Sequence, residues 1–226
     1  MRTKYCAGAR HGKICDARGF SLIELVIVML IVFLLAAMAI PSYTSMTRYL
    51  RIAGDARDLN GLVAQAKMRA AQDFTHARVN ANLAANTFQL EVWDKAGNGG
   101  TGCWKTDGDT VNPCTSTSSP VQSLSPGVSF GFAGVSAGAP NPQAVIAQAP
   151  ACSTGVAGGT AGSSIANTSC VEFNSRGIPV ASNGSPTPND ALYVTDSNTV
   201  CGVTIITSGL IQVWSTSAST TAWAPR

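Results

Sequence analysis

The chain has 226 residues, of which 45% are hydrophobic and 12% are charged, and it holds 15 Lys and Arg against 12 Asp and Glu. Its net charge of +3 comes from the first 19 residues, which hold five basic residues and one acidic residue, so that 10 basic and 11 acidic residues follow them. This near-neutral remainder argues against a protein that captures nucleic acid through a broadly basic surface.

An apolar run follows the basic beginning of the chain and continues to Ile40. From Phe20 to Ile40 it has about the 20 residues needed to cross a membrane, and Glu24 is its ionisable residue. A carboxylate at that depth costs a few kcal/mol unless a cation compensates it. Cleavage between Gly19 and Phe20 would free an amine one helical turn from Glu24, in the same subunit or in a neighbour. The basic residues before the run predict that its amino-terminal end faces the cytoplasm and that everything after Ile40 faces the periplasm or the exterior.

This junction resembles the processing site of type IV pilins and type II secretion pseudopilins. The resemblance rests on Gly19 before the cut, Phe20 after it, Glu24 as the fifth residue of the processed chain, and Pro41. It implies that a prepilin peptidase removes residues 1–19 and methylates Phe20, and that Glu24 helps each subunit to dock into a growing filament. The implied partners are other pilin or pseudopilin subunits, the peptidase, the inner-membrane assembly platform and the membrane itself.

Two other interpretations of the same segment stand beside this one. Ala37-Met38-Ala39 looks like a signal-peptidase site after an apolar region, which would release a soluble secreted protein. The charge of Glu24 would interrupt the apolar region that an ordinary signal peptide requires. The second alternative is an uncut single-span anchor, which would leave Gly19 and Glu24 without a reason.

Beyond Pro41 the sequence predicts that the helix resumes and becomes amphipathic up to about Phe74. Its apolar residues recur at three- and four-residue steps, which places them on one face: Ile52, Leu59, Leu62, Val63, Ala66 and Ala70. Pro41 should kink the helix or loosen its preceding turn, and Gly54 and Gly61 weaken it further along. A helix from Phe20 to Phe74 is longer than a globular domain requires, so its first half must be buried in membrane or in other subunits.

After His76 the periodicity changes from helical to alternating. Ala77–Ala81 and Thr87–Trp93 alternate like half-buried strands, with a turn between them, and so predict a hairpin. Further strands are expected at residues 127–132, 169–173, 191–195, 200–207 and 210–214, and turns at 174–177 and 207–209. Residues 133–167 are rich in Gly, Ala, Ser and Pro, with one apolar island at Val145-Ile146, so a surface loop or partial disorder is expected there.

Five cysteines follow residue 19, in a region that would be exported and where disulfides persist: Cys103, Cys114, Cys152, Cys170 and Cys201. Because five is odd, at least one is unpaired or pairs outside the chain. The favoured pairing joins Cys103 to Cys114 and Cys152 to Cys170, which staples the 133–167 loop. Cys170 with Cys201 is a competitor, since both lie in strand-like segments. The absence of a Cys-x-x-Cys pair and of suitable His spacing argues against a metal site.

Few residues suggest enzymatic chemistry, and neither an enzyme nor a cofactor is expected. His76 stands at the predicted helix end, where capping carbonyls or facing solvent is the ordinary role. Asp107-Gly108-Asp109 does not have the spacing of an EF-hand loop, which favours a solvated turn over a calcium site. Among the tryptophans, Trp93 and Trp214 are expected in the core, whereas Trp104, in a loop, is the candidate for an exposed recognition residue.

The order of strands also resembles the GspH/FimT type of minor pilin or pseudopilin. The hairpin, Phe173-Asn174-Ser175-Arg176-Gly177 and the closing strands around residues 204–214 carry this resemblance. In that group a Gly-Arg-x-Arg stretch in the final strands contacts DNA in the DNA-uptake members. Here the run is Gly209-Leu210-Ile211-Gln212, without either arginine, which weakens the case for binding nucleic acid.

The sequence therefore predicts an α+β, pilin-like fold with a long amino-terminal helix packed against an antiparallel β-sheet region. Its expected parts are a leader (1–19), a transmembrane and assembly helix (20–41), an amphipathic helix (42–76) and a β-rich domain (77–226). The expected function is that of a filament subunit, anchored in the inner membrane before assembly and then part of a periplasmic or cell-surface filament. A minor pilin is the first interpretation, and a type II secretion pseudopilin, a major pilin and a membrane-anchored module for DNA or a surface ligand are the alternatives.

Overall fold

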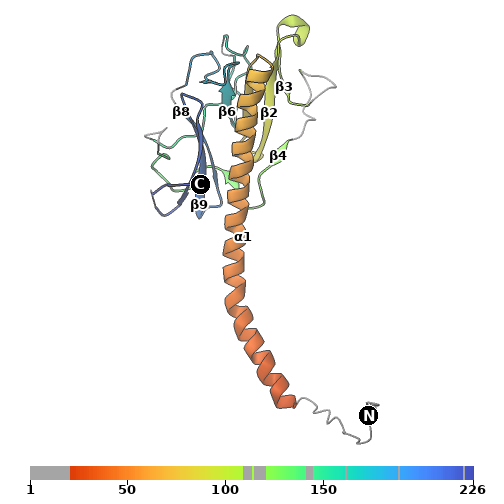
Figure 1. The fold of residues 1–226 in the computed structure, drawn as a ribbon, viewed down its shortest axis with the longest axis vertical. Coiled ribbons are helices and arrows are strands. Elements are labelled where there is room, and N and C mark those ends of the chain that lie inside the picture. The colour runs from red at the N-terminus through yellow and green to blue at the C-terminus, as the bar shows by residue number, and fades with distance from the viewer. Residues whose placement is uncertain are drawn as a thin grey trace, which may run out of the picture. The chain divides into compact units, whose positions relative to one another are not determined.

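The computed structural model describes residues 21–108, 114, 121–140, 145–160, 162–187, 189–220 and 222–226. It has one long helix and antiparallel strands, which confirms the predicted α+β class (Figure 1). The elements are α1 (Leu22–Gln72), β1 (Ala77–Asn82), β2 (Thr87–Asp94), η1 (Asn98–Gly100), β3 (Cys103–Thr106), β4 (Gln122–Ser123), β5 (Ser129–Phe130), β6 (Thr168–Phe173), β7 (Pro179–Val180), β8 (Asn189–Thr195), β9 (Thr199–Ile206), β10 (Ile211–Ser217) and β11 (Ala224–Pro225).

Two compact units make up the chain, Met1–Met46 and Thr47–Arg226. The second unit, called the head below, contains the end of α1 and all the strands. The helix continues without interruption through Pro41. The helix is ended by its own backbone: Phe74 adopts a left-handed φ of 47°, and Thr75 N donates to Ala70 O at 3.1 Å. A left-handed residue just after the last turn is a common way to end a helix.

The apolar stripe of α1 in the head is buried, as its spacing predicts. Ile52, Leu59, Val63, Ala66 and Ala70 are fully buried, and Leu62 is nearly so. They share one core with apolar residues from both sheets, so this part of α1 covers strands of each. Figure 1 shows this part of the helix lying along the strands. The burial of this face accounts for the helix here better than propensity does, since Gly54 and Gly61 are poor helix formers.

The first sheet has the order β3-β2-β1-β6-β7, with β4 also paired to β2. The predicted hairpin is confirmed: β1 and β2 pair antiparallel, with Arg78 opposite Glu91. The turn is held by Asn82, whose Oδ1 accepts from the backbone N–H groups of Ala84 and Ala85. Along β1 the alternate residues Ala77, Val79 and Ala81 face the core with no exposed surface.

The second sheet has the order β11-β10-β9-β8-β5 and contains the strands expected within residues 127–132, 191–195, 200–207 and 210–214, whereas the strand expected at 169–173 is β6 of the first sheet. Its central strands β8 and β9 are nearly continuous in apolar residues, which is typical of a sheet covered on both faces. One face lies against the main core, while Tyr193, Val200 and Trp214 belong to a second cluster together with Val135 and Ile146.

The segment 133–167 is in its described part an irregular and largely exposed loop, as its composition suggested, but several of its apolar residues anchor it in the core. In its described part, Val135, Ala139, Ile146 and Ala149 are buried, although the segment contains none of the named strands. Gln148 fixes it further, donating from Nε2 to Tyr193 O and accepting from Tyr193 N, each at 2.8 Å. The apolar outer face of β8 requires a cover, and this segment supplies it.

Candidate functional site

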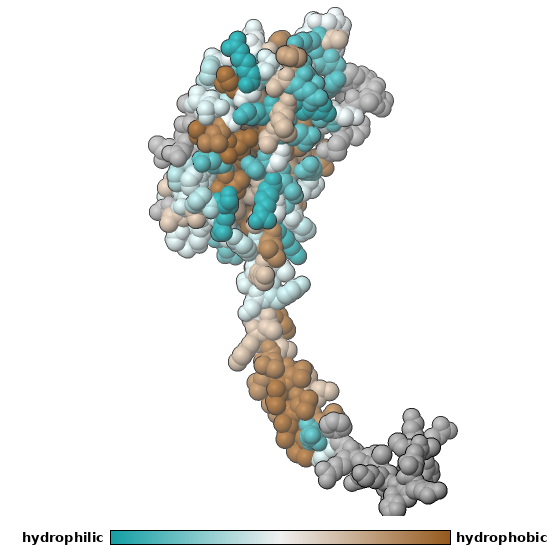
Figure 2. Space-filling view, viewed as in Figure 1, coloured by the Kyte–Doolittle hydropathy of each residue, from teal (hydrophilic) through white to brown (hydrophobic). Residues whose placement is uncertain are grey.

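The first part of α1 is an unpaired apolar surface. Every side chain from Leu22 to Ile40 is exposed, with values from 48% at Val26 to 80% at Leu22 among the large apolar residues. Within the described residues, α1 is the one helix long and apolar enough to cross a membrane. Figure 2 shows this continuous hydrophobic stretch, with a hydrophilic group near its beginning. Apolar surface costs about 25 cal/mol per Å² in water, so this surface is suited to lipid or to other protein.

Glu24 lies in the first turn of α1 and is exposed. The positive end of the helix dipole favours a carboxylate there, but in lipid this contribution is small beside the cost of burying the charge. Gly19 and Phe20, the predicted cleavage and methylation residues, lie outside the described residues. Pro41 is inside α1, and its side chain is likewise outside the described part.

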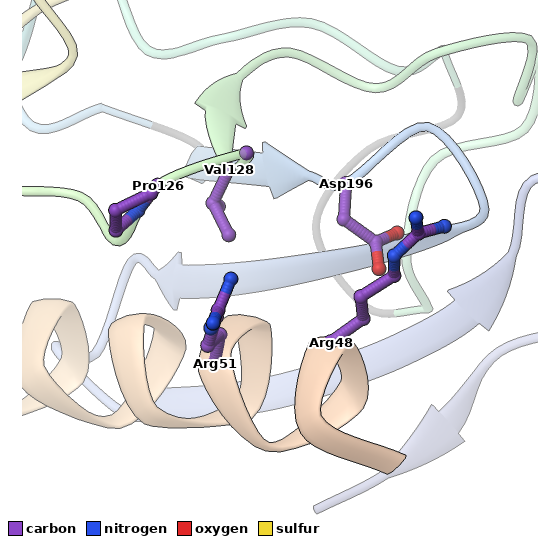
Figure 3. Close-up of a pocket in the computed structure, with 6 residues that line it drawn as sticks. Arg48, Arg51, Pro126, Val128 and Asp196 are labelled. Carbon is purple, nitrogen blue, oxygen red and sulfur yellow. The ribbon is translucent and has the colours of Figure 1, made fainter. Parts of the chain in front are cut away.

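The head carries a basic groove beside the amino-terminal end of its part of α1. The groove has a volume of about 380 Å³ and is lined by Arg48, Arg51, Pro126, Gly127, Val128 and Asp196. In Figure 3, Arg48 points toward Asp196, and Arg51 points toward the segment that holds Pro126 and Val128. Both arginines are exposed, and within the described part of the chain neither forms an ion pair. The groove therefore sets two guanidinium groups beside one carboxylate, so its charged lining is positive overall.

The wall of this groove is a rigid turn. Val128 N donates to Ser125 O at 2.9 Å, and Gly127 has a φ of 86°, which fits a type II turn with proline at its second position and glycine at its third. The buried Asp55 carboxylate clamps the turn onto α1 by accepting from Ser125 N at 3.0 Å and from Ser125 Oγ at 2.8 Å. The same helix therefore supplies both the cations and the anchor of the wall.

A buried ion pair lies on the first sheet, on the face away from the main core. Arg78 Nε donates to Glu91 Oε2 at 2.6 Å, and both side chains are almost fully buried. Asn80 and Gln89 donate to the other oxygen of Glu91, and Arg78 Nη1 donates to Ser153 O at 2.7 Å. A buried pair needs this many additional hydrogen bonds to offset desolvation.

Trp104 belongs to this cluster and is not the exposed recognition residue expected from the sequence. It lies in β3, half-buried, with its ring 5.3 Å from that of Trp93, and the Arg78 guanidinium lies 4.0 Å from its ring centroid. The expected loop is a strand at this point because residues 103–106 pair with β2. Trp93 and Trp214 are buried, as predicted.

His76 has a definite partner, in place of the capping or solvent-facing role expected for it. Its Nδ1 lies 2.8 Å from Glu172 Oε1, and the carboxylate is almost fully buried. Nearby, a cavity of about 60 Å³ is lined in part by Arg78, Glu172 and Asp190. Burial raises the pKa of Asp190, and the hydrogen bond from Thr187 Oγ1 at 3.0 Å acts in the opposite direction.

The cysteines form two disulfides in the structure, Cys103–Cys114 and Cys152–Cys170, which are the pairs that the sequence favoured. Cys201 is a buried free thiol. Burial raises its pKa to about 11, so the thiol stays neutral and unreactive at physiological pH. The competing pair Cys170–Cys201 is not formed, because Cys170 is bonded to Cys152.

The acidic side chains around residue 107 are engaged in ion pairs. Asp107 Oδ2 accepts from Arg69 Nε at 3.0 Å, and Asp94 Oδ2 lies 3.4 Å from Lys105 Nζ. Asp109 lies outside the described residues. Across the part of the chain that the structure covers, no group of three or more His, Cys, Asp or Glu side chains is arranged to hold a metal ion.

Residues 15–40 match the model of the prokaryotic N-terminal methylation motif. No curated protein and no solved structure matched the chain. The motif spans the predicted cleavage junction, Glu24 and the apolar part of α1. It supports a precursor of the type IV pilin or pseudopilin class, processed by prepilin peptidase and assembled with other such subunits, and it points to a structural subunit. Motif and apolar helix together are consistent with an inner-membrane anchor before assembly.

Sequence reasoning identified the residues of this motif but missed the basic groove and the buried ion pair. Arg78 and Glu91 carried a usable signal, because each occupies a polar position of its predicted strand and the hairpin register sets them opposite each other. The groove had no such signal, since Asp55 and Ser125 are 70 residues apart in the chain.

Proposed function

We propose that this chain is a structural subunit of a type IV pilus or pilus-like filament and assembles through the first part of α1. The observation that carries the proposal is the exposed apolar surface from Leu22 to Ile40, with Glu24 near its start, within a methylation motif. Such a helix is stable in a bilayer, and also among like helices in a filament core.

Assembly requires the subunit to leave the bilayer. The helix then exchanges lipid contacts for contacts with other apolar helices, so little apolar surface is exposed to water during the transfer. The Glu24 carboxylate is matched by the new amine of Phe20, in the same subunit or in a neighbour. The paired charges lower the cost that a lone carboxylate has in an apolar environment.

Within this class we propose a minor pilin that helps to initiate or cap the filament. The support is the resemblance of the strand order to the GspH/FimT type described above. A type II secretion pseudopilin would use the same helix and the same charge pairing. Deletion of the gene separates the two: loss of surface pili with normal secretion supports the pilin, and loss of secretion with normal pili supports the pseudopilin.

The test of the filament role is Glu24→Ala in the full-length precursor, with Asp73→Ala as the matched control. Asp73 is an exposed carboxylate outside the apolar surface. We expect both variants to be cleaved to a product that begins at Phe20, as measured by mass spectrometry of the amino terminus. Glu24→Ala should be depleted at least tenfold from sheared filaments relative to Asp73→Ala. Normal incorporation of Glu24→Ala would contradict the docking role.

A further inference from the structure

Three asparagines of the head stand directly before a glycine: Asn60, Asn98 and Asn183. In such a pair the backbone nitrogen of the glycine can attack the side-chain amide carbon of the asparagine, because glycine has no side chain to hinder the approach. The attacking nitrogen must give up its proton, so a hydrogen bond that holds this N–H in place protects the pair until the local structure opens. The three pairs differ in how firmly the glycine N–H is held.

Two of the pairs are held by hydrogen bonds. Gly61 lies inside α1, where its N–H donates to the carbonyl four residues earlier. Gly184 N donates to Ala181 O at 2.8 Å, and Asn183 Oδ1 accepts from Ser185 N at 3.0 Å. In both pairs the nitrogen that would attack is already engaged, and in the second pair the amide under attack is engaged as well.

The pair Asn98-Gly99 is open to solvent. Gly100 N donates to Gly97 O at 3.1 Å, and Asn98 and Gly99 have φ values of 51° and 68°, which is the pattern of a type I′ turn with Asn-Gly at its centre. Among the described residues, Gly99 N and the Asn98 side chain have no hydrogen-bond partner, and both residues are exposed. Both reacting groups are therefore unprotected.

Few contacts keep this turn closed. The attack requires a rotation of the Asn98 backbone that brings its side chain over Gly99 N. This rotation disturbs the Asn98 carbonyl, which accepts from Thr101 Oγ1 at 2.8 Å and from Thr101 N at 3.4 Å. A Cβ added at Gly99 or Gly100 would meet nothing within 4 Å, so no neighbouring segment packs on the turn there. An exposed turn with so few contacts opens at a small cost in free energy.

We propose that Asn98 is the site of spontaneous deamidation among these three pairs, with water as the co-reactant. Gly99 N forms a bond to Asn98 Cγ, its proton passes to the side-chain nitrogen, and that nitrogen leaves as ammonia. The product of this step is a five-membered cyclic imide. Water then adds to one of the two imide carbonyl carbons and reopens the ring to aspartate or isoaspartate. One water is consumed and one ammonia is released, without oxidation or reduction.

The reaction changes the surface beside a disulfide. Either product replaces a neutral amide by a carboxylate, and isoaspartate also adds a methylene group to the main chain, which is incompatible with the tight turn. Gly97 packs so closely on the Cys103–Cys114 bridge that an added Cβ would lie 2.5 Å from one sulfur and 2.8 Å from the other. Deamidation therefore alters this part of the head as the protein ages, and the inference does not depend on the filament role.

The first test compares the three pairs within the wild-type protein. The solubilised full-length protein is incubated at mildly alkaline pH, both folded and in guanidinium chloride, and peptide mapping by mass spectrometry follows each asparagine over time. In the denatured chain we expect similar rates at all three. In the folded protein Asn98 should convert at least tenfold faster than Asn60 or Asn183, because these two react only after local opening. Folded-state rates that are equal, or highest at another of the three pairs, would overturn the proposal.

The second test uses Gly99→Ala, with Gly100→Ala as the matched control. Both glycines have a left-handed φ, 68° and 92°, and both face open space, so the two substitutions strain the turn alike. Only the first places a methyl group on the residue that attacks. Gly99→Ala should slow the conversion of Asn98 at least fivefold relative to Gly100→Ala. Equal rates in the two variants would contradict the attack by Gly99 N.

Discussion

At the scale of single residues, Asp190 is a carboxylate in a buried environment that disfavours its charged form. Its side chain is almost completely buried, its one described hydrogen bond comes from Thr187, and it shares a small cavity with Arg78 and Glu172. Arg78 is already neutralised by Glu91 at 2.6 Å. Because burial raises the pKa of Asp190 above its ordinary value of 3.8, the folded protein holds this proton to higher pH than the unfolded chain does.

The sign of the resulting pH dependence follows from linkage. The contribution of Asp190 to stability is fully present below its unfolded pKa and is lost as the pH rises through its folded pKa. We expect Asp190→Asn, which keeps an oxygen for Thr187, to stabilise the head at pH 7. At pH 3 the difference should vanish. Urea unfolding across this pH range measures it, with the exposed Asp73→Asn as the control, and a destabilised Asp190→Asn at pH 7 would contradict the assignment.

The sequence predicts that Arg78 and Glu91 lie opposite each other, but it does not predict that they are buried. The alternation of β1 and β2 places Arg78 and Glu91 on the polar face of the hairpin, a position that normally meets solvent. They are buried because the segment around Ser153 crosses this face and accepts a hydrogen bond from Arg78. No local pattern predicts that cover, since it comes from a part of the chain about 75 residues away.

At the scale of elements, α1 has two surfaces with different tasks. In the head, its buried stripe joins the core of both sheets, whereas from Leu22 to Ile40 every side chain is exposed. The spacing of apolar residues in the sequence distinguishes the two parts of the helix. The first part is apolar on all sides, and the later part is apolar on one face only.

A substitution in the buried stripe tests the role of this element. Leu59 is fully buried, so Leu59→Ala removes apolar contacts and leaves a cavity, which should cost about 2–5 kcal/mol of the unfolding free energy. Met68→Ala, on the same helix but 64% exposed, should change it by less than about 0.5 kcal/mol. Chemical unfolding of the solubilised protein gives both values. Equal effects of the two substitutions would mean that this face does not anchor the head.

Element prediction failed at β3, a short strand that directly follows a stretch rich in glycine. Residues 103–106 look like part of a loop, yet they form β3 because β2 offers an open edge and Trp93 stands opposite Trp104. By contrast, the β1–β2 hairpin was predictable because alternation, turn and partner strand are all local.

At the scale of the whole molecule, the Cys152–Cys170 disulfide fixes the segment that covers the first sheet. It closes a loop with a sequence separation of 18 residues, and within that loop lies Ser153, the acceptor for Arg78. Crosslinking limits the freedom of the unfolded chain, and a loop of this size contributes about 3 kcal/mol in the entropic description.

We therefore expect the double substitution Cys152→Ser and Cys170→Ser to lower the unfolding free energy by about 3 kcal/mol or more, because Arg78 also loses its cover. Cys201→Ala is the control, since it changes a cysteine without removing a crosslink. Thermal unfolding under non-reducing conditions compares the two. A double variant as stable as the wild type would show that the segment is held by packing alone.

The sequence by itself determined the methylation motif and its apolar run, the helical stripe, the hairpin and the α+β class. These features depend on neighbours in the chain: a motif of adjacent residues, a period of 3.6 or of 2, or a turn between two strands. Only the tertiary structure decided the rest, namely the cover over Arg78 and Glu91, the packing of residues 133–167, the third strand of the hairpin region and the groove beside Arg48 and Arg51. In all of these except the third strand, whose partner β2 is near in the chain, the partners are far apart in sequence. Their contact is set by how two sheets and one helix share a core, which the free energy of the whole fold decides and no local pattern encodes.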